Sequence, residues 1–495
     1  MNLDPVAVSF TLYTLAIVGL GLYSARFARE TESDFFLAGR GLGPWVAALS
    51  SSASAESGWV TLGLVGMAYK TGIGALWIVL GTFVAFLVNW FVLAWRLREQ
   101  SERYHALTLV DFLASPWQGI VGRLIRVVGV LVILSMLVAY VAAQLNAAGK
   151  TFEGIFDWDY RLGVVVGFAI IVVYTVTGGF RAIAWTDVVQ ATFMILTVLV
   201  LPVLLIGQIG GPAEFWHALE TDAENPNLLD PFAGRTGLAL IGFLALWLGI
   251  PLGNAGQPHV LVRLMAIRDR SAVLRGGIIS SLWVLLLFGG AVLLGMSARV
   301  YFHNGLADPE QTLMAIARDS SLIPGFVGGM IIAAVLAAIC STADSQLLVA
   351  ASAISHDVVV RLCGVELSLR ARRILDRSAV ILLGLVALAI AIGEVRSVFS
   401  FVLDYGWAGL GAGFGPATIC LLLWKRTTGW GLLTGMLVGV VTAILWRLLL
   451  PDLHQQLYNL VPAFALSSIT IVIVSLVTPS NHAAAPAPDA GESSR

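Results

Sequence analysis

Residues 48–58 read Ala-Leu-Ser-Ser-Ser-Ala-Ser-Ala-Glu-Ser-Gly, and residues 248–258 read Leu-Gly-Ile-Pro-Leu-Gly-Asn-Ala-Gly-Gln-Pro. Both stretches interrupt long apolar runs with serine, glycine, glutamate or proline, of which proline removes a backbone donor and glycine weakens a helix. Non-helical backbone at bilayer depth is tolerated only where protein or a water-filled cavity satisfies it. Broken helices at matching places in two halves of a chain are typical of a transporter's binding site. The two stretches therefore predict a carrier, although glycine and serine also permit close helix packing.

The rest of the chain has the composition of an all-α integral membrane protein. Of its 495 residues, 58% are hydrophobic and 12% charged, whereas soluble proteins carry about 25% charged residues. A net charge of −1 argues against a nucleic-acid partner. Three cysteines are too few for a disulfide framework or a metal cluster. The seven histidines show no ligand spacing, and no nucleophile lies beside a base in a recognisable motif. We expect neither an enzyme nor a bound cofactor.

We expect one transmembrane domain over residues 1–478 and a disordered cytoplasmic tail over residues 479–495, which are rich in alanine, proline and serine. No basic residue precedes the first apolar run, so we expect that run to be retained as a helix and not cleaved as a signal. With the N-terminus outside and the C-terminus inside, most of the 29 basic residues fall on the cytoplasmic side. The thirteen expected spans lie near residues 6–25, 43–68, 73–97, 124–150, 161–178, 184–208, 236–255, 275–301, 323–349, 377–394, 398–424, 428–449 and 460–478.

Short motifs in a fixed order give the chain a family resemblance. The motifs are Leu37–Pro44, Ser57–Trp59, Ala106–Asp111, Gly178–Phe180, Trp185–Gln190, Gly256–His259, Ser341–Thr342, Ser345–Leu348, Trp407–Gly409 and Phe414–Pro416. From about residue 5 to 478 the chain resembles the sodium:solute symporter family, and most closely the bacterial sodium/proline symporters. The resemblance implies an inverted repeat of five plus five helices over about residues 43–424, with one extra helix before it and two after it. It also implies Na⁺-coupled uptake of a small zwitterionic solute, best guessed as L-proline, across the bacterial inner membrane.

The main ion site is expected between the first broken helix and a later span. Ala338, Ser341 and Thr342 stand at i, i+3 and i+4, so two hydroxyls and a carbonyl share one helix face. The carbonyls of Ala53 and Glu56 could face them from the broken helix. By resemblance, these five positions match the family's main Na⁺ site. Spacing alone favours helix packing, because hydroxyls in membrane helices usually bond to their own backbone.

A second group of polar residues also lies at membrane depth. A buried carboxylate costs about 2.5–3.5 kcal/mol on insertion scales, so Asp187 and Asp344 call for a reason. Asp187 begins a helix, where an anion is favourable in any case. By resemblance its Trp-Thr-Asp context matches an aspartate on the inner Na⁺ route. Asp187, Asp344 and Ser345 are therefore expected to form an exit route or a second cation site.

The solute is expected beside the first broken helix. By resemblance, Trp59 and Tyr140 line the solute pocket, with Ser57 and Gly58 next to Trp59. Aromatic faces suit a compact, partly apolar solute, and a tyrosine hydroxyl offers one directed hydrogen bond. Asn254 would add a donor and an acceptor from the second broken helix.

Two departures from the proline symporters leave alternatives open. Ala55 stands where they carry aspartate, so Glu56 either supplies the missing charge from the adjacent position or titrates, which would make protons a coupling ion. Ile250 and Asn254 replace two aromatic residues, although Trp247 lies one turn away. The solute could then be another amino acid, a betaine or an organic acid. A sensor of the same fold that binds solute without transporting it is the rival from another class.

Overall fold

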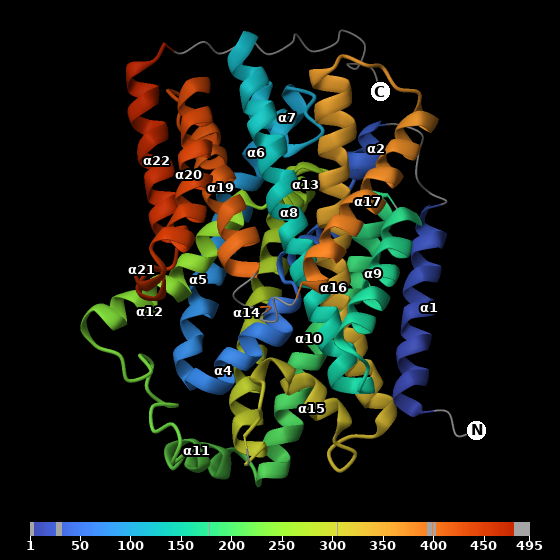
Figure 1. Ribbon diagram of the computed structural model, residues 1–495, viewed down its shortest axis with the longest axis vertical. Coiled ribbons are helices and arrows are strands. Elements are labelled where there is room, and N and C mark those ends of the chain that lie inside the picture. Colours follow the sequence, from blue (N-terminus) through green and yellow to red (C-terminus); the bar gives the residue numbers. More distant parts are fainter. Residues whose placement is uncertain are drawn as a thin grey trace.

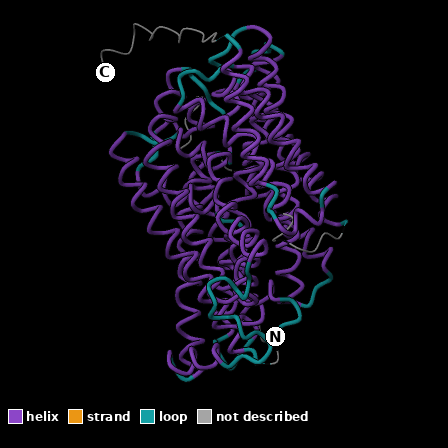
Figure 2. The backbone as a smooth tube through the Cα atoms, turned by 90° about the vertical axis from the view of Figure 1, so that its left-hand side faces the viewer, coloured by secondary structure: helices purple, strands orange, loops and turns teal. Residues whose placement is uncertain are grey.

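The computed structural model describes residues 4–25, 32–177, 179–303, 305–393, 398 and 402–479. These residues form helices and loops, and none of them belongs to a named strand. Figure 2 shows that most helices run along the long axis of the molecule. Residue 178 and parts of the predicted spans at 377–394 and 398–424 lie outside the described residues, as does nearly all of the predicted tail.

The first half of the chain begins with one helix at the edge of the molecule and then the first interrupted helix (Figure 1). Its elements are α1 (Pro5–Ala25), α2 (Glu32–Leu37), η1 (Ala38–Arg40), α3 (Pro44–Ala55), η2 (Trp59–Leu64), α4 (Val65–Thr71), η3 (Gly72–Ala75), α5 (Leu76–Leu87), η4 (Val88–Ala94), α6 (Trp95–Arg103), α7 (Leu109–Ala114), α8 (Gly119–Phe156), α9 (Tyr160–Thr177), α10 (Phe180–Ile209) and α11 (Pro212–Glu220).

The second half contains the other interrupted helix and ends in three long helices on the side opposite α1 (Figure 1). Its elements are α12 (Gly237–Gly249), η5 (Ile250–Gly256), α13 (Pro258–Met265), α14 (Arg270–Tyr301), η6 (Pro309–Gln311), α15 (Thr312–Arg318), α16 (Gly325–Ser352), η7 (Ala353–Leu362), α17 (Leu369–Ile392), η8 (Val402–Trp407), α19 (Ala408–Leu423), α20 (Gly429–Leu449), α21 (Pro451–Gln456) and α22 (Leu460–Val477).

Ten helices in the described residues are long and apolar enough to cross a membrane, and two shorter helices are apolar as well. One of the ten, the run from Trp59 to Arg103, holds parts of two predicted spans. Gly72 lies within this run at a φ of +59°, a conformation that glycine adopts without strain. The count from length and composition is therefore lower than the predicted thirteen, which stays a prediction.

The core of the molecule is built around α16 and α3. Helix α16 packs against α1, α8, α10 and α17, and α3 packs against α10, α13, α14 and α16. Every residue of α16 from Ile331 to Ser352 is buried, including serines, a threonine and an aspartate. The outer helices instead leave large apolar side chains such as Leu131, Val203 and Ile278 exposed. This pattern suits helices that face hydrocarbon on the outside and a polar site within.

Candidate functional site

The first predicted helix break is present and lies in the middle of the core. Helix α3 ends at Ala55, and Glu56 has extended backbone angles of φ −103° and ψ 92°. The chain becomes helical again at Gly58, and the turn that follows is the π-helix η2. Short π-helical segments are frequent at functional sites. The serine-rich sequence thus unwinds at the glutamate, as predicted.

The second predicted break is also present, and fixed side chains satisfy its carbonyls. Helix α12 gives way to the 3₁₀ turn η5, and Gln257 is extended before Pro258 opens α13. Trp407 Nε1 donates to the carbonyl of Ile250 at 2.6 Å. The Gln257 amide donates to the carbonyls of Gly253 at 3.1 Å and Trp407 at 3.3 Å. The freed backbone groups are therefore bound within the protein, as bilayer depth requires.

Four of the five predicted ion-site residues meet across the interface between α3 and α16. Ser341 Oγ donates to the carbonyls of Ala53 at 3.0 Å and Ala338 at 3.3 Å. Thr342 Oγ1 donates to the carbonyl of Ser54 at 3.2 Å. All of these residues are buried. The two hydroxyls therefore bond to carbonyls at the end of α3, which plain packing along a single helix would not require.

Glu56, the fifth predicted residue, lies at the break itself. Its side chain is buried, and its carboxylate has no hydrogen-bond partner among the described residues. Its backbone N–H donates to the carbonyl of Ser52 at 3.0 Å. The structure therefore places Glu56 next to the ion-site carbonyls without joining it to Ser341 or Thr342 by a hydrogen bond.

The predicted second cation group is also assembled, and Ser54 connects it to the first. Asp187 Oδ2 accepts from Ser50 Oγ at 2.6 Å. Ser345 Oγ lies 3.0 Å from Asp344 Oδ1 and 2.7 Å from the carbonyl of Ser341. Ser54 Oγ lies 3.2 Å from both the Ser341 carbonyl and Ser345 Oγ. Ser54 Oγ also lies 3.4 Å from Asp187 Oδ2, so a chain of oxygen atoms runs from the α3–α16 contact to Asp187.

Arg263 is a member of this group that lies between two predicted spans, at residues 236–255 and 275–301. Its side chain is buried in α13, and its Nη2 lies 3.1 Å from Asp187 Oδ2. The predicted span ended at residue 255, whereas the helix after the break runs from Pro258 to Met265. A signal was present, since His259 and Arg263 stand at i and i+4 on one face of a helix that begins at Pro258.

The predicted solute residues around the first break lie together. Ser57 Oγ and Tyr140 Oη are 3.3 Å apart, and the Gly58 N–H donates to Gln144 Oε1 at 3.1 Å. The Trp59 ring packs edge-on against Phe288 with centroids 5.8 Å apart. All of these side chains are buried.

Two further residues, Gln144 and His259, belong to this wall and were not predicted. The ring of His259 stands perpendicular to that of Tyr140, with centroids 6.1 Å apart. Both residues are buried, and the side-chain N–H₂ of Gln144 and both ring nitrogens of His259 have no hydrogen-bond partner among the residues that the structure describes. Buried polar groups are normally paired, so these atoms suit contacts with a polar solute.

Asn254 is placed elsewhere. It lines a cavity of about 440 Å³ whose other walls are mostly apolar residues of α5, η5 and α22, among them Val84, Pro251 and Phe464. No hydrogen bond or ring contact joins Asn254 to Trp59 or Tyr140 within the described part of the chain. Asn254 lies in the 3₁₀ turn η5, so residue spacing along an α-helix does not fix the direction of its side chain.

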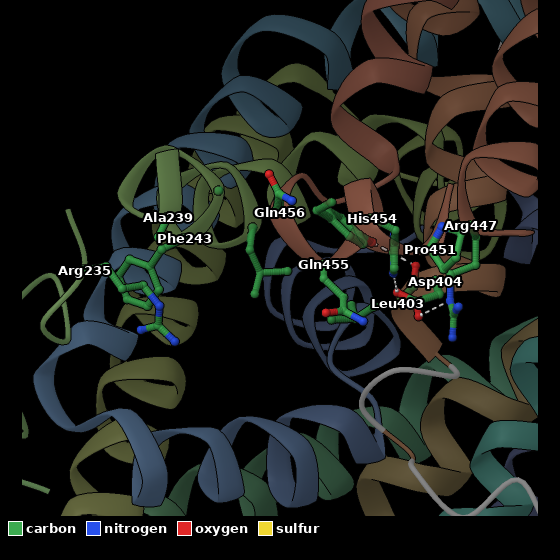
Figure 3. A pocket seen from close by; sticks show the side chains of 13 residues that line it. Arg235, Ala239, Phe243, Leu403, Asp404, Arg447, Pro451, His454, Gln455 and Gln456 are labelled. Carbon is green, nitrogen blue, oxygen red and sulfur yellow. Dashed lines mark hydrogen bonds and ion pairs between the residues drawn. The ribbon is translucent and has the colours of Figure 1, made fainter. Parts of the chain in front are cut away.

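A cavity of about 480 Å³ lies on the other side of η8, between α12, α20 and α21 (Figure 3). Asp404 in η8 binds Arg447 at 3.0 Å and His454 at 3.3 Å on its wall. Gly406, two residues further along η8, packs so closely on Tyr140 that a Cβ there would lie 2.8 Å from the tyrosine Cβ. The single element η8 therefore separates this cavity from the solute wall.

A charged cluster elsewhere ties α7 to η7. Asp111, His356 and Asp357 are close enough to hold a metal ion, but Arg126 lies 2.9 Å from both carboxylates and Arg361 lies 3.1 Å from Asp111. Burial alone would raise the pKa of Asp111, but the hydrogen bond with His356 and the charge of Arg126 hold it well below its usual range. The positive charges of the guanidinium groups already compensate these carboxylates. We therefore interpret the cluster as a structural link between α7 and η7.

Comparison with known proteins places the chain among solute carriers. The model of the sodium:solute symporter family matches residues 35–439. The osmoregulated proline transporter of Bacillus subtilis is 34% identical over 476 residues, which cover 96% of this chain and 95% of the relative. The sodium/proline symporter of Escherichia coli is 34% identical over 480 residues, 96% of this chain and 93% of the relative.

Two solved structures share the fold. A Na⁺-coupled sialic acid symporter in a substrate-bound outward-open state superposes with a TM-score of 0.80 and 17% identity, covering 97% of this chain and 99% of that one. A transporter of the nucleobase-cation-symport-1 family in a closed conformation gives a TM-score of 0.54 and 14% identity, covering 90% and 95%. At these identities the likeness concerns the fold alone.

Proposed function

The chain belongs to the sodium:solute symporter family, and we propose that it takes up L-proline together with Na⁺ across the bacterial inner membrane by alternating access. It is a transporter and not an enzyme. The named proline transporters among its relatives, each matched over more than nine-tenths of both chains, support the choice of solute. The observation that carries the proposal is the oxygen-lined contact between the unwound end of α3 and α16.

Na⁺ is the proposed coupling ion because the α3–α16 contact offers the ligands that a hard cation prefers. Carbonyl oxygens of Ala53 and Ala338 and hydroxyl oxygens of Ser341 and Thr342 converge there. Each hydroxyl now donates its proton to a carbonyl, and a small rotation would turn a lone pair toward an ion instead. We propose no cofactor besides the coupling ion. Glu56 would contribute its carbonyl and a nearby negative charge.

The solute is proposed to lie against Trp59, Tyr140, Ser57 and Gly58. The indole would cover the apolar ring of proline, and the tyrosine hydroxyl would bind its carboxylate. Gly58 fits this role because a Cβ there would lie 3.1 Å from Ala147 and Ile339, which would push its N–H away from the site. Asn254 would join the site only if η5 turned toward it.

The finer architecture follows from the family and the two breaks. We propose thirteen spans with the N-terminus outside and the C-terminus inside, and an inverted repeat of five plus five helices over about residues 43–424. The breaks at Glu56 and at η5 fall in the first and the sixth helix of such a core. Residues 1–478 would form one transmembrane domain.

The proposed cycle couples ion binding to a rocking motion. Na⁺ entering from outside would bind α3 to α16, complete the solute wall and favour closure of the outer side. Proline is zwitterionic, so each turnover with one Na⁺ would move one positive charge inward. A potential of 100 mV supplies about 2.3 kcal/mol per charge, and a tenfold Na⁺ gradient supplies about 1.4 kcal/mol. Together they would sustain a proline gradient of several hundred-fold, roughly.

Uptake by the purified protein in liposomes tests the proposal. We expect labelled proline to accumulate under an inward Na⁺ gradient and to stay near background when K⁺ replaces Na⁺. Unlabelled amino acids, betaines and organic acids added in excess would show which solutes compete for the site. Uptake that ignores Na⁺, or that an inward proton gradient drives equally well without Na⁺, would contradict the coupling. Solute binding without any uptake would favour the sensor.

A further inference from the structure

The guanidinium group of Arg263 lies among the oxygen atoms that would otherwise receive a cation between the ion site and the cytoplasm. Its Nη2 contacts Asp187 Oδ2 at 3.1 Å and Ser345 Oγ at 2.5 Å. Its Nε donates to Ser50 Oγ at 3.0 Å, and its Nη1 donates to the carbonyl of His259 at 2.5 Å. The side chain is 1% exposed, so water does not screen these contacts.

With both carboxylates ionised, the charges of this group do not cancel. Asp187 and Asp344 are both buried, and Arg263 is the one basic side chain that contacts either of them among the described residues. One oxygen of each carboxylate, Asp187 Oδ1 and Asp344 Oδ2, has no hydrogen-bond partner in the described part of the chain. A buried acceptor without a partner is costly, so these two atoms mark a place for a further positive charge. The group can therefore attract a cation while Arg263 remains in place.

Arg263 and an incoming Na⁺ would nevertheless compete for the same atoms. Asp187 Oδ2 and Ser345 Oγ already serve the guanidinium, and two cations at this distance repel each other strongly in a buried site. The side chain of Ser54 connects the main ion site with the group around Arg263. Its hydroxyl lies 3.2 Å from the Ser341 carbonyl and 3.2 Å from Ser345 Oγ. A Na⁺ that leaves the α3–α16 contact on this side would thus meet a site that is already partly filled.

We propose that Arg263 is a tethered cation that competes with Na⁺ for Asp187 and Ser345, and so keeps Na⁺ from being retained on its way to the cytoplasm. The inference rests on the proposed Na⁺-coupled transport. Arg263 is a positioning residue in this role, because it acts through Asp187, makes no hydrogen bond to the described atoms of the main ion site, and meets the solute wall at the backbone carbonyl of His259. A purely structural ion pair between Arg263 and Asp187 would have the same geometry. The test therefore needs a measured quantity that changes in opposite directions for a structural role and for competition with Na⁺.

Replacement of Arg263 by glutamine provides that readout in proline uptake by proteoliposomes. Without the guanidinium, Na⁺ should bind more tightly, so we expect the Na⁺ concentration for half-maximal uptake to fall about fivefold or more, as for other coupled sites. The maximal rate should fall too, and Na⁺ inside the liposomes should inhibit at lower concentrations. Arg268→Gln is the matched control, because the Arg268 side chain is well exposed and, within the described part of the chain, its ion-pair partner is its neighbour Asp269. It should leave both parameters unchanged.

Further variants keep the test decisive if Arg263→Gln folds poorly. Arg263→Lys retains the charge but cannot hold Asp187 and Ser345 with one planar group, so its Na⁺ requirement should lie between those of the wild type and the glutamine variant. In an Asp187→Asn background, Arg263→Gln should no longer change the Na⁺ requirement. If the wild type transports with Na⁺, an unchanged or raised Na⁺ requirement in Arg263→Lys or Arg263→Gln would overturn the inference. A wild type without Na⁺-driven uptake would instead contradict the proposed function.

Discussion

Ser341 and Thr342 are the residues whose hydroxyls connect α16 to the unwound end of α3. Because each would become a ligand of Na⁺, replacing either by alanine should raise the Na⁺ concentration for half-maximal uptake by about tenfold, the effect of losing one hydrogen bond to a charged group. Ser352→Ala is the control, since its hydroxyl bonds only within α16, to the Val349 carbonyl at 2.8 Å. Uptake with an unchanged Na⁺ requirement in both variants would remove these residues from the site.

Glu56 is a buried carboxylate at the break, and no basic side chain among the described residues forms an ion pair with it. An isolated buried charge needs a compensating partner, and Na⁺ at the adjacent carbonyls would provide one. We therefore expect Glu56→Gln to raise the Na⁺ requirement about tenfold while leaving the pH profile of uptake unaltered. Uptake measured over a range of pH and Na⁺ concentrations separates the roles. A changed pH profile with an unchanged Na⁺ requirement would favour proton coupling through Glu56.

At the scale of single residues, the sequence and the family resemblance predicted more of the ion site than of the solute site. Ser341 and Thr342 could be placed because their spacing along a regular helix fixes their direction. Asn254 lies within a stretch whose backbone is not α-helical and Arg263 follows it, so neither the end of the span nor the direction of a side chain follows from counting. His259 was missed for the same reason.

At the scale of elements, the second break depends on a close backbone contact between η5 and α19. A Cβ on Gly256 would lie 2.6 Å from the carbonyl oxygen of Leu410 and 2.7 Å from the backbone nitrogen of Gly415, neither of which can yield easily. Gly256→Ala should therefore lower stability by about 1–3 kcal/mol and impair uptake. Thermal unfolding of the detergent-solubilised protein would show this. Gly207→Ala, where a Cβ meets nothing within 4 Å, should leave the unfolding temperature unchanged or slightly higher.

The two breaks themselves could be predicted from sequence, whereas their exact form could not. Serine, glycine and proline clusters inside apolar runs indicate where a membrane helix is weak. They do not indicate that one break is a short extended link at Glu56 and the other a 3₁₀ turn held by Trp407 and Gln257. The 3₁₀ turn depends in part on Trp407, which lies 157 residues from Ile250 along the chain, and local propensity does not encode such a partner.

At the scale of the whole molecule, the proposed orientation can be tested with native cysteines. Cys363 is exposed between η7 and α17, whereas Cys340 is buried and Cys420 is half-buried. If the C-terminus is inside, a membrane-impermeant maleimide should label inside-out vesicles strongly and intact cells hardly at all. Cys363→Ser should abolish most of the labelling. Strong labelling of intact cells that the Cys363→Ser variant lacks would reverse the assigned topology.

The global arrangement could be predicted to the extent that hydropathy and charge bias determine it. Apolar runs identified the membrane class, and described helices lie within each expected span. The number of crossings is harder to derive, because a run such as Trp59–Arg103 contains a turn at Gly72 that composition does not register. The burial of polar residues along α16 likewise follows from the packing of many helices and not from its own sequence.

The two helix breaks differ in how their backbone carbonyls are bound. Around η5, an indole and an amide hold the freed carbonyls rigidly, whether or not anything is bound. Around the end of α3, the hydroxyls of Ser341 and Thr342 donate to the carbonyls. An arriving ion can replace these two hydrogen bonds. A vacant carrier therefore leaves few of its carbonyls unpaired, which lowers the cost of resetting toward the outside without cargo. Because the free-energy cost of this return step is low, the unloaded protein would reset quickly toward the outside.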